Sequence, residues 1–401
     1  MIDKWSIFTK SSRGIKIRSS DVITRENCCL CGSRELQHRL NLKKFPIYMG
    51  VTNKDYSSDQ FFDQTWVECN NCGCLQLLKL LPLSLIYQYN HHTEVVGQVW
   101  KNHHDSFANF IARNKPRKIL EIGAAHGYLA KELSRELPNS EYTIVEPDSN
   151  MVSPNINIIK GYIEEHYAEL KEKDCVIHSH VLEHVYKPVD FINQISNHVS
   201  IGTDMYVSFP NMDGLIESGG LNSLNFEHTY FLDPNQAETT FRNSGFEILD
   251  KQQYLMHSYF YHLKKIGSVQ KNHYEFSNIK KQSTKFLDMV NSLVGFIATT
   301  NKLIEDHSGP VYLFGAHVFS QSLIVLGLKT DKILGILDNA REKQNKRLYG
   351  TPFQVFNPSV ILEPSNVMVI LNASHYQAEI RNQLLSMNKN LQIVENLQFT
   401  M

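Results

Sequence analysis

Seven cysteines occur in the chain, and four of them form two pairs with the spacing of a metal site. Each pair is a Cys-x2-Cys segment followed directly by a glycine, as tight metal-binding turns prefer. Four thiolates complete a tetrahedral zinc site with no open coordination position, so the pattern predicts structural rather than catalytic Zn2+. The predicted ligands are Cys28, Cys31, Cys69 and Cys72, with Cys29 and Cys74 just outside the pairs as alternatives.

Two other interpretations of the cysteines remain open. They could be buried thiols without a metal, or part of a zinc ribbon that binds nucleic acid. The surroundings lack the basic and aromatic stripe that a nucleic-acid-binding ribbon needs, which favours the structural site.

Glu227 and His228 are a second group with the potential for chemistry. They are adjacent in a loop that precedes a helix expected to begin at Asp233-Pro234. A histidine near its ordinary pKa can remove a proton, and a neighbouring carboxylate can orient it or handle a second proton. The alternative for His228 is a loop histidine with satisfied hydrogen bonds and no catalytic role.

A glycine turn lies between these two groups in the sequence. The segment from Ile119 to Gly127 reads ILEIGAAHG, and a helix is expected from Tyr128 to Glu136. Strand, glycine turn and helix bring a cofactor over the carboxyl end of a sheet, and Gly123, Ala124 and Gly127 let the backbone approach it closely. The form is typical of the loop that binds S-adenosylmethionine (SAM), with Glu121 serving the amino-acid end of the cofactor.

The following strands extend this cofactor site. Tyr142–Val145 is an expected strand that ends in Glu146, about 20 residues after the turn, where an acid suits the ribose hydroxyls. Pro147 then breaks the strand. The segment 174–180 is a further strand ending in polar residues, among them His178 and His180, and a helix is expected to begin at Val181. A nicotinamide dehydrogenase is the competing interpretation, but the turn lacks the G-x-G-x-x-G spacing.

The segment from Leu77 to Ile111 is rich in aromatic residues and histidine. Apolar residues at Trp100, Phe107, Phe110 and Ile111 have the spacing of an amphipathic helix. The His91-His92 and His103-His104 pairs could hold a second metal, but adjacent residues on a helix point in different directions, which favours packing.

The last third of the chain reads as a smaller α/β unit. A long helix is expected over 272–307, followed by strands at 311–317, 333–339 and 366–372. The turn after the first strand could admit a phosphate at the start of the next helix. Lys343 and Arg347 lie in a basic loop that could hold a nucleotide diphosphate, and a solvated charged loop is the alternative.

Bulk properties restrict the class of protein. The chain has 401 residues, 42% hydrophobic residues and a net charge of -1, which fits a globular protein of two or three domains. The near-neutral balance predicts no nucleic-acid partner, and no apolar run has membrane-spanning length. The N-terminus has no signal-peptide pattern, so we expect a cytoplasmic protein, where clustered cysteines favour metal over disulfides. Oligomeric state does not follow from the sequence.

Taken together, these motifs resemble the class I SAM-dependent methyltransferases. More narrowly, the chain is similar to the three-domain sugar C-methyltransferases that act on nucleotide-linked keto-deoxysugars. The resemblance rests on the cysteine pairs, the glycine turn, the stretch from His180 to His184, the Glu227-His228 pair and the third domain. It implies an α/β architecture: a zinc-binding domain over 1–80, a Rossmann-like SAM domain over 81–270 and a smaller Rossmann-like domain over 271–401.

The resemblance also implies roles for individual residues. His228 would be the base that forms an enolate, Glu227 its partner, and His180 a lining residue of the same pocket. The family commonly has a tyrosine where this chain has Asn225, so Asn225 or Tyr230 would contact the keto oxygen. The third domain would help to bind the sugar nucleotide, and the metal-stabilised first domain would act as a lid.

Two alternative functions stay open at this point. Methylation of oxygen or nitrogen on a sugar nucleotide or glycan precursor would also use a base and SAM. A protein that binds SAM or a partner without turnover belongs to a different class, and tight SAM binding without methyl transfer would indicate it.

Overall fold

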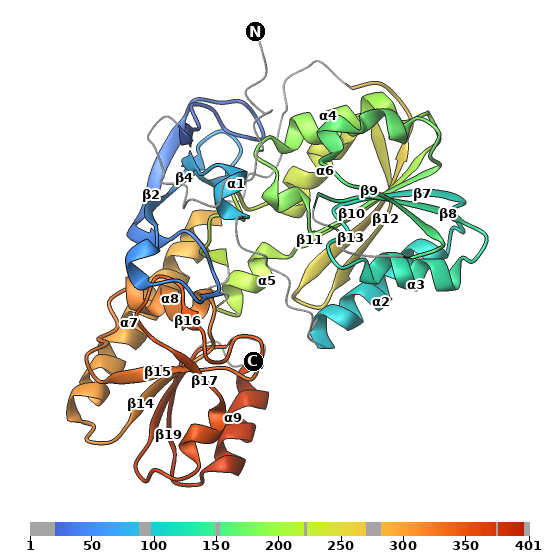
Figure 1. The fold of residues 1–401 in the computed structure, drawn as a ribbon. Helices are drawn as coiled ribbons and strands as arrows, with labels where there is room; N and C mark the ends of the chain where they lie inside the picture. The colour runs from blue at the N-terminus through green and yellow to red at the C-terminus, as the bar shows by residue number, and fades with distance from the viewer. Residues whose placement is uncertain are drawn as a thin grey trace.

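The computed structural model describes residues 21–87, 98–147, 149, 153–219, 223–269, 282–373 and 376–396. Three bodies follow one another along the chain (Figure 1). The N-terminal domain, drawn in blue, lies beside both the central sheet and the smaller C-terminal sheet. The mixed α/β fold class predicted from the sequence is therefore confirmed.

The N-terminal domain is built on antiparallel strands. Strands β2 (Leu36–Pro46), β4 (Phe61–Cys69) and β5 (Leu75–Leu77) form a sheet in the order β2-β4-β5. β1 (Ile23–Thr24) pairs with β6 (Lys79–Leu80), and β3 (Val51–Thr52) pairs with β16 (Arg347–Leu348) of the C-terminal domain. A 3-10 helix η2 (Tyr56–Ser58) and a short helix α1 (Leu83–Ile86) complete the domain.

The central domain contains a seven-stranded sheet in the order β12-β13-β11-β10-β7-β8-β9. The five strands from β11 to β9 are parallel, while β13 runs antiparallel to β11 and to β12. Their bounds are β7 (Lys118–Ile122), β8 (Glu141–Val145), β9 (Ile156–Ile159), β10 (Cys175–Ser179), β11 (Asp204–Pro210), β12 (Phe246–Tyr254) and β13 (Ser258–Lys265).

Helices cover both faces of this sheet (Figure 1). One face packs against α2 (Gln98–Ala112) and α3 (Tyr128–Glu136). The other packs against α4 (Pro188–His198) and α6 (Pro234–Asn243). α5 (Met212–Glu217) and the 3-10 helices η3 (Ile163–Glu165), η4 (Tyr167–Leu170) and η5 (Leu182–His184) lie in the connections. The two-sided covering explains why the parallel strands are nearly continuous apolar runs.

The sequence placed one helix start too early. Only the 3-10 turn η5 follows the expected start at Val181, and α4 begins at Pro188. A residue before proline avoids the helical region, and Lys187 has φ -128° and ψ 74°. By contrast, α6 begins at the predicted Asp233-Pro234, where Asp233 caps the helix and Gln236 completes a capping box.

The C-terminal domain is a five-stranded parallel sheet in the order β17-β15-β14-β18-β19. A long helix, α7 (Gln282–Asp306), leads into it; the first part of the helix predicted over 272–307 lies outside the described residues. The remaining elements are β14 (Val311–Phe314), α8 (Val318–Val325), β15 (Ile333–Leu337), β17 (Val355–Phe356), the 3-10 helix η7 (Pro358–Ile361), β18 (Met368–Leu371), α9 (Gln377–Met387) and β19 (Gln392–Glu395).

The N-terminal domain shares its core with both other domains. One apolar cluster runs from Trp66 through Phe286 of α7 to Tyr349. A second cluster joins Cys69 to Tyr230 and to α6. Separating these surfaces would expose buried apolar area on two sides, so the lid motion expected from the sequence would cost free energy.

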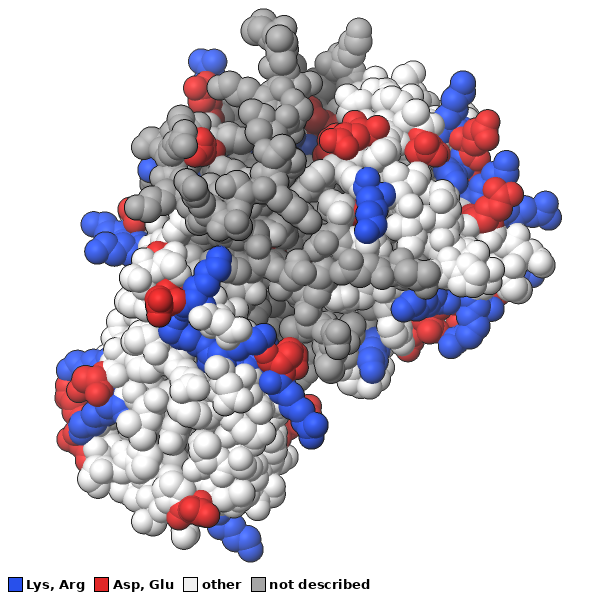
Figure 2. Space-filling view, in the orientation of Figure 1, with Lys and Arg blue, Asp and Glu red and all other residues white. Residues whose placement is uncertain are grey.

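Charges are interspersed over the described part of the visible face, with a band of Lys and Arg where the C-terminal lobe meets the rest of the molecule (Figure 2). Among the helices of the described residues, none combines the length and apolar character needed to cross a membrane.

Candidate functional site

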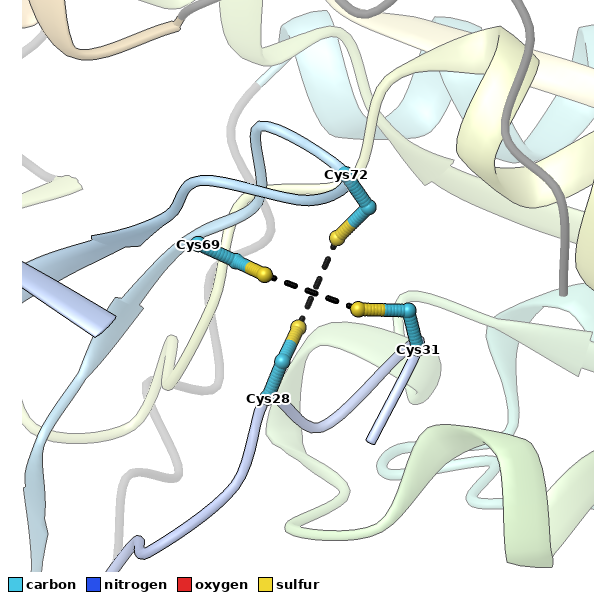
Figure 3. Close-up of side chains that lie close together, drawn as sticks. All are labelled: Cys28, Cys31, Cys69 and Cys72. Atoms are coloured by element: carbon cyan, nitrogen blue, oxygen red, sulfur yellow. Dashed lines mark hydrogen bonds between the residues drawn. The ribbon is translucent and has the colours of Figure 1, made fainter. Parts of the chain in front are cut away.

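The four paired cysteines converge at one point. The Sγ atoms of Cys28, Cys31, Cys69 and Cys72 all lie within 4.8 Å of one another. Figure 3 shows the four side chains pointing to a common centre. The Sγ atoms lie 3.5 Å apart between Cys28 and Cys72 and between Cys31 and Cys69. A disulfide needs about 2.05 Å, while tetrahedral zinc with bonds of about 2.3 Å sets sulfur atoms about 3.8 Å apart. The donor set and spacing fit zinc.

The backbone around the cysteines has the form of two metal-binding turns. Gly32 and Gly73 both have φ 73°, a left-handed conformation that favours glycine. Their N–H groups donate to the carbonyls of Cys28 and Cys69. The Gln76 amide donates to Cys28 Sγ at 3.3 Å, a bond that orients the ligand.

The cysteine cluster is joined directly to the central domain. The side chain of Gln236, in α6, donates to the Cys72 carbonyl at 3.0 Å. The 229–231 segment pairs with β5: Leu77 N–H donates to Thr229 O, and Phe231 N–H donates to Leu75 O. The cluster therefore lies one strand away from the loop of Glu227 and His228.

The glycine turn after β7 is tightly packed. Gly123 has φ 72°, and a Cβ atom built on it would lie 2.5 Å from Val181 Cγ2. Ala125, with φ 46°, donates its N–H to Glu146 Oε2 at 3.0 Å. Gly127, with φ 65°, begins α3. The turn therefore has no room for a side chain at Gly123, and it brings the predicted ribose-binding acid, Glu146, to its edge.

Burial changes the ionisation of Glu121 on β7. This side chain is 2% exposed and accepts a hydrogen bond from Tyr142 at 2.7 Å. Burial raises the pKa of Glu121 to about 7, against the lowering effect of the tyrosine bond. Ala124 is part of the turn and Pro147 is exposed just beyond Glu146, before residue 148, which lies outside the described residues.

His178 lies on β10 opposite Ile122, the residue that precedes the glycine turn. It is fully buried on β10 and packs against Phe191 of α4, with ring centroids 5.5 Å apart. Side chains of a strand alternate between faces, and the His178 side chain lies on the face covered by α4 and α6. This differs from the expected cofactor contact.

The loop of Glu227 and His228 is shaped by Asn225. The side-chain oxygen Oδ1 of Asn225 accepts hydrogen bonds from the backbone N–H groups of Glu227 and His228, both at 2.7 Å. Burial raises the pKa of Glu227 to about 8. Burial lowers the pKa of His228, against the opposing effect of nearby Glu183. At neutral pH the carboxyl group is therefore largely protonated and the imidazole neutral.

The segment after β10 faces this loop. The His184 and His228 rings have centroids 4.9 Å apart, and His184 Nδ1 lies 4.0 Å from Glu227 Oε2. Tyr87 OH is 2.9 Å from the same nitrogen. Atoms of Glu183, His184 and His228 lie within 4.8 Å of one another. Val181 of this segment also contacts the glycine turn, so the titratable cluster and the predicted cofactor site are neighbours.

His180 belongs to the same edge of the sheet. It has φ 53°, its Nδ1 lies 3.0 Å from Glu183 Oε1, and its Nε2 lies 2.9 Å from Ser258 Oγ. Burial lowers its pKa to about 3. Glu183 therefore lies between two predicted site histidines, His180 and His228.

Three residues predicted to contact substrate instead bond to other residues of the protein. Tyr230 is 1% exposed and its hydroxyl donates to Leu182 O, so it is a core residue. Arg347 forms two hydrogen bonds to the Asp59 carboxylate, at 2.6 and 2.8 Å, and joins two domains. Lys343 Nζ lies 3.2 Å from Asp338 Oδ2, beside the turn after β14.

Sequence reasoning missed several residues of the site. Glu183 and His184 lay in a quoted motif without an assigned role. Arg25, three residues before the first cysteine, is buried and donates hydrogen bonds to Thr229 beside the Glu227-His228 loop, and the sequence carries no signal for this. His257 enters the site from the turn between β12 and β13.

Comparison with known proteins identifies the central domain. Residues 89–251 match the family model described as a methyltransferase domain. No curated protein matches the chain in sequence. The central part of the chain, residues 89–251, is therefore similar to a methyltransferase domain.

Solved structures give weaker likenesses. Mitomycin 7-O-methyltransferase MmcR has a TM-score of 0.36 and 12% identity, covering 42% of this chain and 55% of its own. Plantazolicin methyltransferase BpumL, in complex with a monoazolic desmethylPZN analogue and SAH, has a TM-score of 0.35 and 15% identity, covering 42% of this chain and 84% of its own. Human N-acetylserotonin methyltransferase, in complex with SAM, has a TM-score of 0.34 and 17% identity, covering 42% of this chain and 53% of its own.

These likenesses do not extend to substrate. Our chain spans little more than half the length of the mitomycin enzyme and of the human enzyme. The low TM-scores carry no inference about the methylated atom, so the reaction has to be argued from the site.

Proposed function

We propose that the protein transfers a methyl group from SAM to carbon in a nucleotide-linked keto-deoxysugar, through an enolate. The observation that supports this most is the pair Glu227 and His228, whose pKa values are shifted in opposite directions within one loop. Two titratable groups with environments that separate their pKa values mark an acid and a base. The pair lies beside the segment that contacts the glycine turn.

In this proposal His228 is the base. Burial keeps its imidazole neutral at neutral pH, which is the form that accepts a proton. The C–H bond next to the ketone breaks, its proton passes to His228, and the electron pair forms the enolate. When bound, SAM supplies an electrophilic methyl group whose bond to sulfur breaks as the new carbon–carbon bond forms. Glu121, the Gly123 turn and Glu146 would hold the cofactor.

Glu227 takes the role of hydrogen-bond donor to the keto oxygen. A carboxyl group with its pKa raised to about 8 is protonated at pH 7 and can donate to an oxygen that gains negative charge. Asn225 positions both residues through the two backbone bonds to its side chain. In this proposal Asn225 organises the loop and does not take over a contact of the family tyrosine hydroxyl with the substrate.

The C-terminal domain is proposed to bind the nucleotide. Gly315 has φ 103° and open space around its position, in a turn whose Ala316 N–H donates to Asp338. Lys343 lies at the same carboxylate and can contact a diphosphate. Arg347 is hydrogen-bonded to the Asp59 carboxylate, so we propose that it holds the C-terminal domain against the N-terminal domain. The four cysteines are proposed to hold structural zinc.

The test is one incubation of the full chain with SAM carrying a carbon-13 methyl group and a panel of 3-keto and 4-keto sugar nucleotides. The NMR shift of the product methyl distinguishes attachment to carbon from attachment to oxygen or nitrogen. A carbon-bound methyl supports the enolate reaction. An oxygen- or nitrogen-bound methyl refutes it while retaining the methyltransferase, and label that stays on SAM across the panel rejects this substrate class.

A matched pair of variants tests the base. His228→Gln keeps a polar side chain of similar size but cannot accept the proton, so we expect turnover to fall about 100-fold or more with SAM affinity unchanged. His38→Gln, on the exposed side of β2, should behave as the wild-type protein. Full turnover by His228→Gln would remove His228 from the mechanism.

A further inference from the structure

Three histidines from separate parts of the central domain meet at the carboxyl edge of the sheet. His103 lies in α2, His180 follows β10, and His257 lies in the turn before β13. A ring nitrogen from each lies within 4.8 Å of the other two. We propose that these three histidines form a second metal site for a divalent transition metal such as zinc. This site is distinct from the four cysteines and goes beyond the proposed function.

The spacing is compatible with zinc after a small closure of the rings. Zinc binds imidazole nitrogen at about 2.0–2.1 Å, so tetrahedral ligands lie about 3.3 Å apart. The three nitrogens lie no more than 4.8 Å apart, so they need to approach one another by about 1.5 Å at most. Imidazole is a preferred ligand of zinc, copper, iron and nickel, and three histidines leave a position open for water or substrate.

His180 has the surroundings of a metal ligand. Its Nδ1 lies 3.0 Å from Glu183 Oε1, which fixes the ring orientation and makes Nε2 the nitrogen available for a metal. A carboxylate behind a histidine ligand is a recurring arrangement in metal sites. His180 is also held in a left-handed backbone conformation, φ 53°, which is uncommon for a residue other than glycine.

His103 contributes an unsatisfied buried atom. The residue has 0% exposure, and its Nε2 lies 3.0 Å from Ser208 Oγ. Its Nδ1 is buried and has no hydrogen-bond partner within the part of the chain that the structure describes. A buried polar atom without a partner is unfavourable, so a ligand that bonds to this nitrogen is favoured over leaving it without one.

Ser258 occupies the space between the other two rings. Its Oγ lies 2.9 Å from His180 Nε2 and 2.6 Å from His257 Nδ1. The Ser258 hydroxyl can turn to another staggered rotamer, which would open this space to a metal. The hydroxyl thus marks the place where a metal would lie between the two rings.

Trp100 forms one wall of the site. Its ring packs edge-on against His180 and against His257, with centroids 4.7 Å apart in both cases. Such an apolar wall restricts water and strengthens the interaction of a metal with its ligands. Because Glu183 lies near both His180 and the His228 cluster, a metal here would be close to the oxygens of a substrate held at His228.

A second group, Glu183, His184 and His228, meets the same distance criterion. A metal there would occupy His228, and the Tyr87 hydroxyl already lies 2.9 Å from His184 Nδ1. We therefore commit to the three-histidine site and use the second group as an outcome of the test.

The test compares the zinc content of the full chain with that of three variants, after saturation with Zn2+ and removal of free metal. We expect about two zinc ions per chain in the wild-type protein and about one in His257→Ala. His104→Ala is the matched control: it removes a histidine next to His103 that is not part of the group, and it should keep two. His184→Ala should also keep two, and loss of a zinc there in place of His257→Ala would move the site to the second group and overturn the proposal.

X-ray absorption at the zinc edge of the wild-type protein gives an independent measurement. Sulfur ligands lie at about 2.3 Å and nitrogen ligands at about 2.0–2.1 Å. A mixed shell supports the histidine site, and a pure sulfur shell after saturation overturns it. Thermal melting and SAM affinity establish whether His257→Ala is folded, and the spectrum decides the proposal even if it is not.

Discussion

Replacement of Arg25 by methionine should loosen the loop of Glu227 and His228 from the N-terminal domain. The guanidinium group is buried and donates to three carbonyl oxygens, those of Leu77, Thr229 and Tyr186, at 3.0, 2.7 and 3.0 Å. It also donates to the Thr229 hydroxyl at 3.2 Å. Arg25→Met keeps the length of the side chain but removes every one of these bonds.

The magnitude follows from the acceptors that lose their donor. Thr229 O retains a bond from Leu77 N–H, so the main loss falls on two carbonyls, each worth about 1–3 kcal/mol when left unsatisfied. Removing a buried cation offsets part of this loss of stability, because the charge no longer has to be desolvated. We therefore expect a loss of about 3 kcal/mol in the free energy of unfolding. For a folding unit of about 150–250 residues, this loss lowers the melting temperature by about 6–12 °C.

Differential scanning calorimetry and steady-state kinetics test this prediction together. The variant should melt at lower temperature and turn over about tenfold more slowly, because the loop that carries His228 is less well held. SAM affinity should not change, since the glycine turn is untouched. Arg34→Met, an exposed arginine of the same segment, is the control. A melting temperature for Arg25→Met within about 1 °C of the wild-type value, or an equal shift in Arg34→Met, would refute the reasoning.

Three further outcomes follow from the structure. Gly123→Ala combines a left-handed conformation, costing about 1–2 kcal/mol, with a Cβ atom 2.5 Å from Val181 Cγ2, so calorimetric titration should show SAM binding weakened at least about tenfold. Glu121 has its pKa raised from 4.5 to about 7, so the folded protein binds more protons than the unfolded chain in that range and stability falls as pH rises from 4.5 to 7. In denaturant unfolding, the difference in stability between pH 5 and pH 8 should therefore be smaller for Glu121→Gln than for the wild-type protein. An unchanged difference would contradict this. Cys72→Ser should lose the cysteine-bound zinc and become sensitive to proteolysis, whereas Cys29→Ser should retain the metal.

The parts of the fold with local signals were predictable from the sequence. The helix expected from Tyr128 to Glu136 has those bounds in the structure, because a glycine turn begins it and an apolar face runs along it. The start of α6 followed from the Asp233-Pro234 cap. These features depend on neighbours within a few residues, and a single sequence contains them all.

Contacts between distant segments were not predictable in the same way. Tyr230 was expected to contact substrate, but it pairs with Gln76 of the N-terminal domain and lies in the core. Arg347 was expected to bind a diphosphate, but it pairs with Asp59. His178 seemed equivalent to His180 because both close a polar strand end. His180 follows the last residue of β10 and contacts Glu183 and Ser258. His178 lies within β10, opposite Val207 and Ile122, and packs against Phe191.

The pairing of β5 with residues 229–231 has a consequence for how the chain is made. The isolated bridge between Gln76 and Tyr230 joins residues roughly 150 positions apart, so during synthesis the N-terminal segment emerges long before its partner. At about 5–20 residues per second the interval is roughly 10–30 seconds. Throughout that time the four cysteines, which we propose to hold zinc, are already available to a metal while the edge of β5 is still unpaired. Pairing with residues 229–231 then covers the edge of β5, so a nascent chain that stalls before residue 231 would keep an open strand edge beside the proposed zinc site.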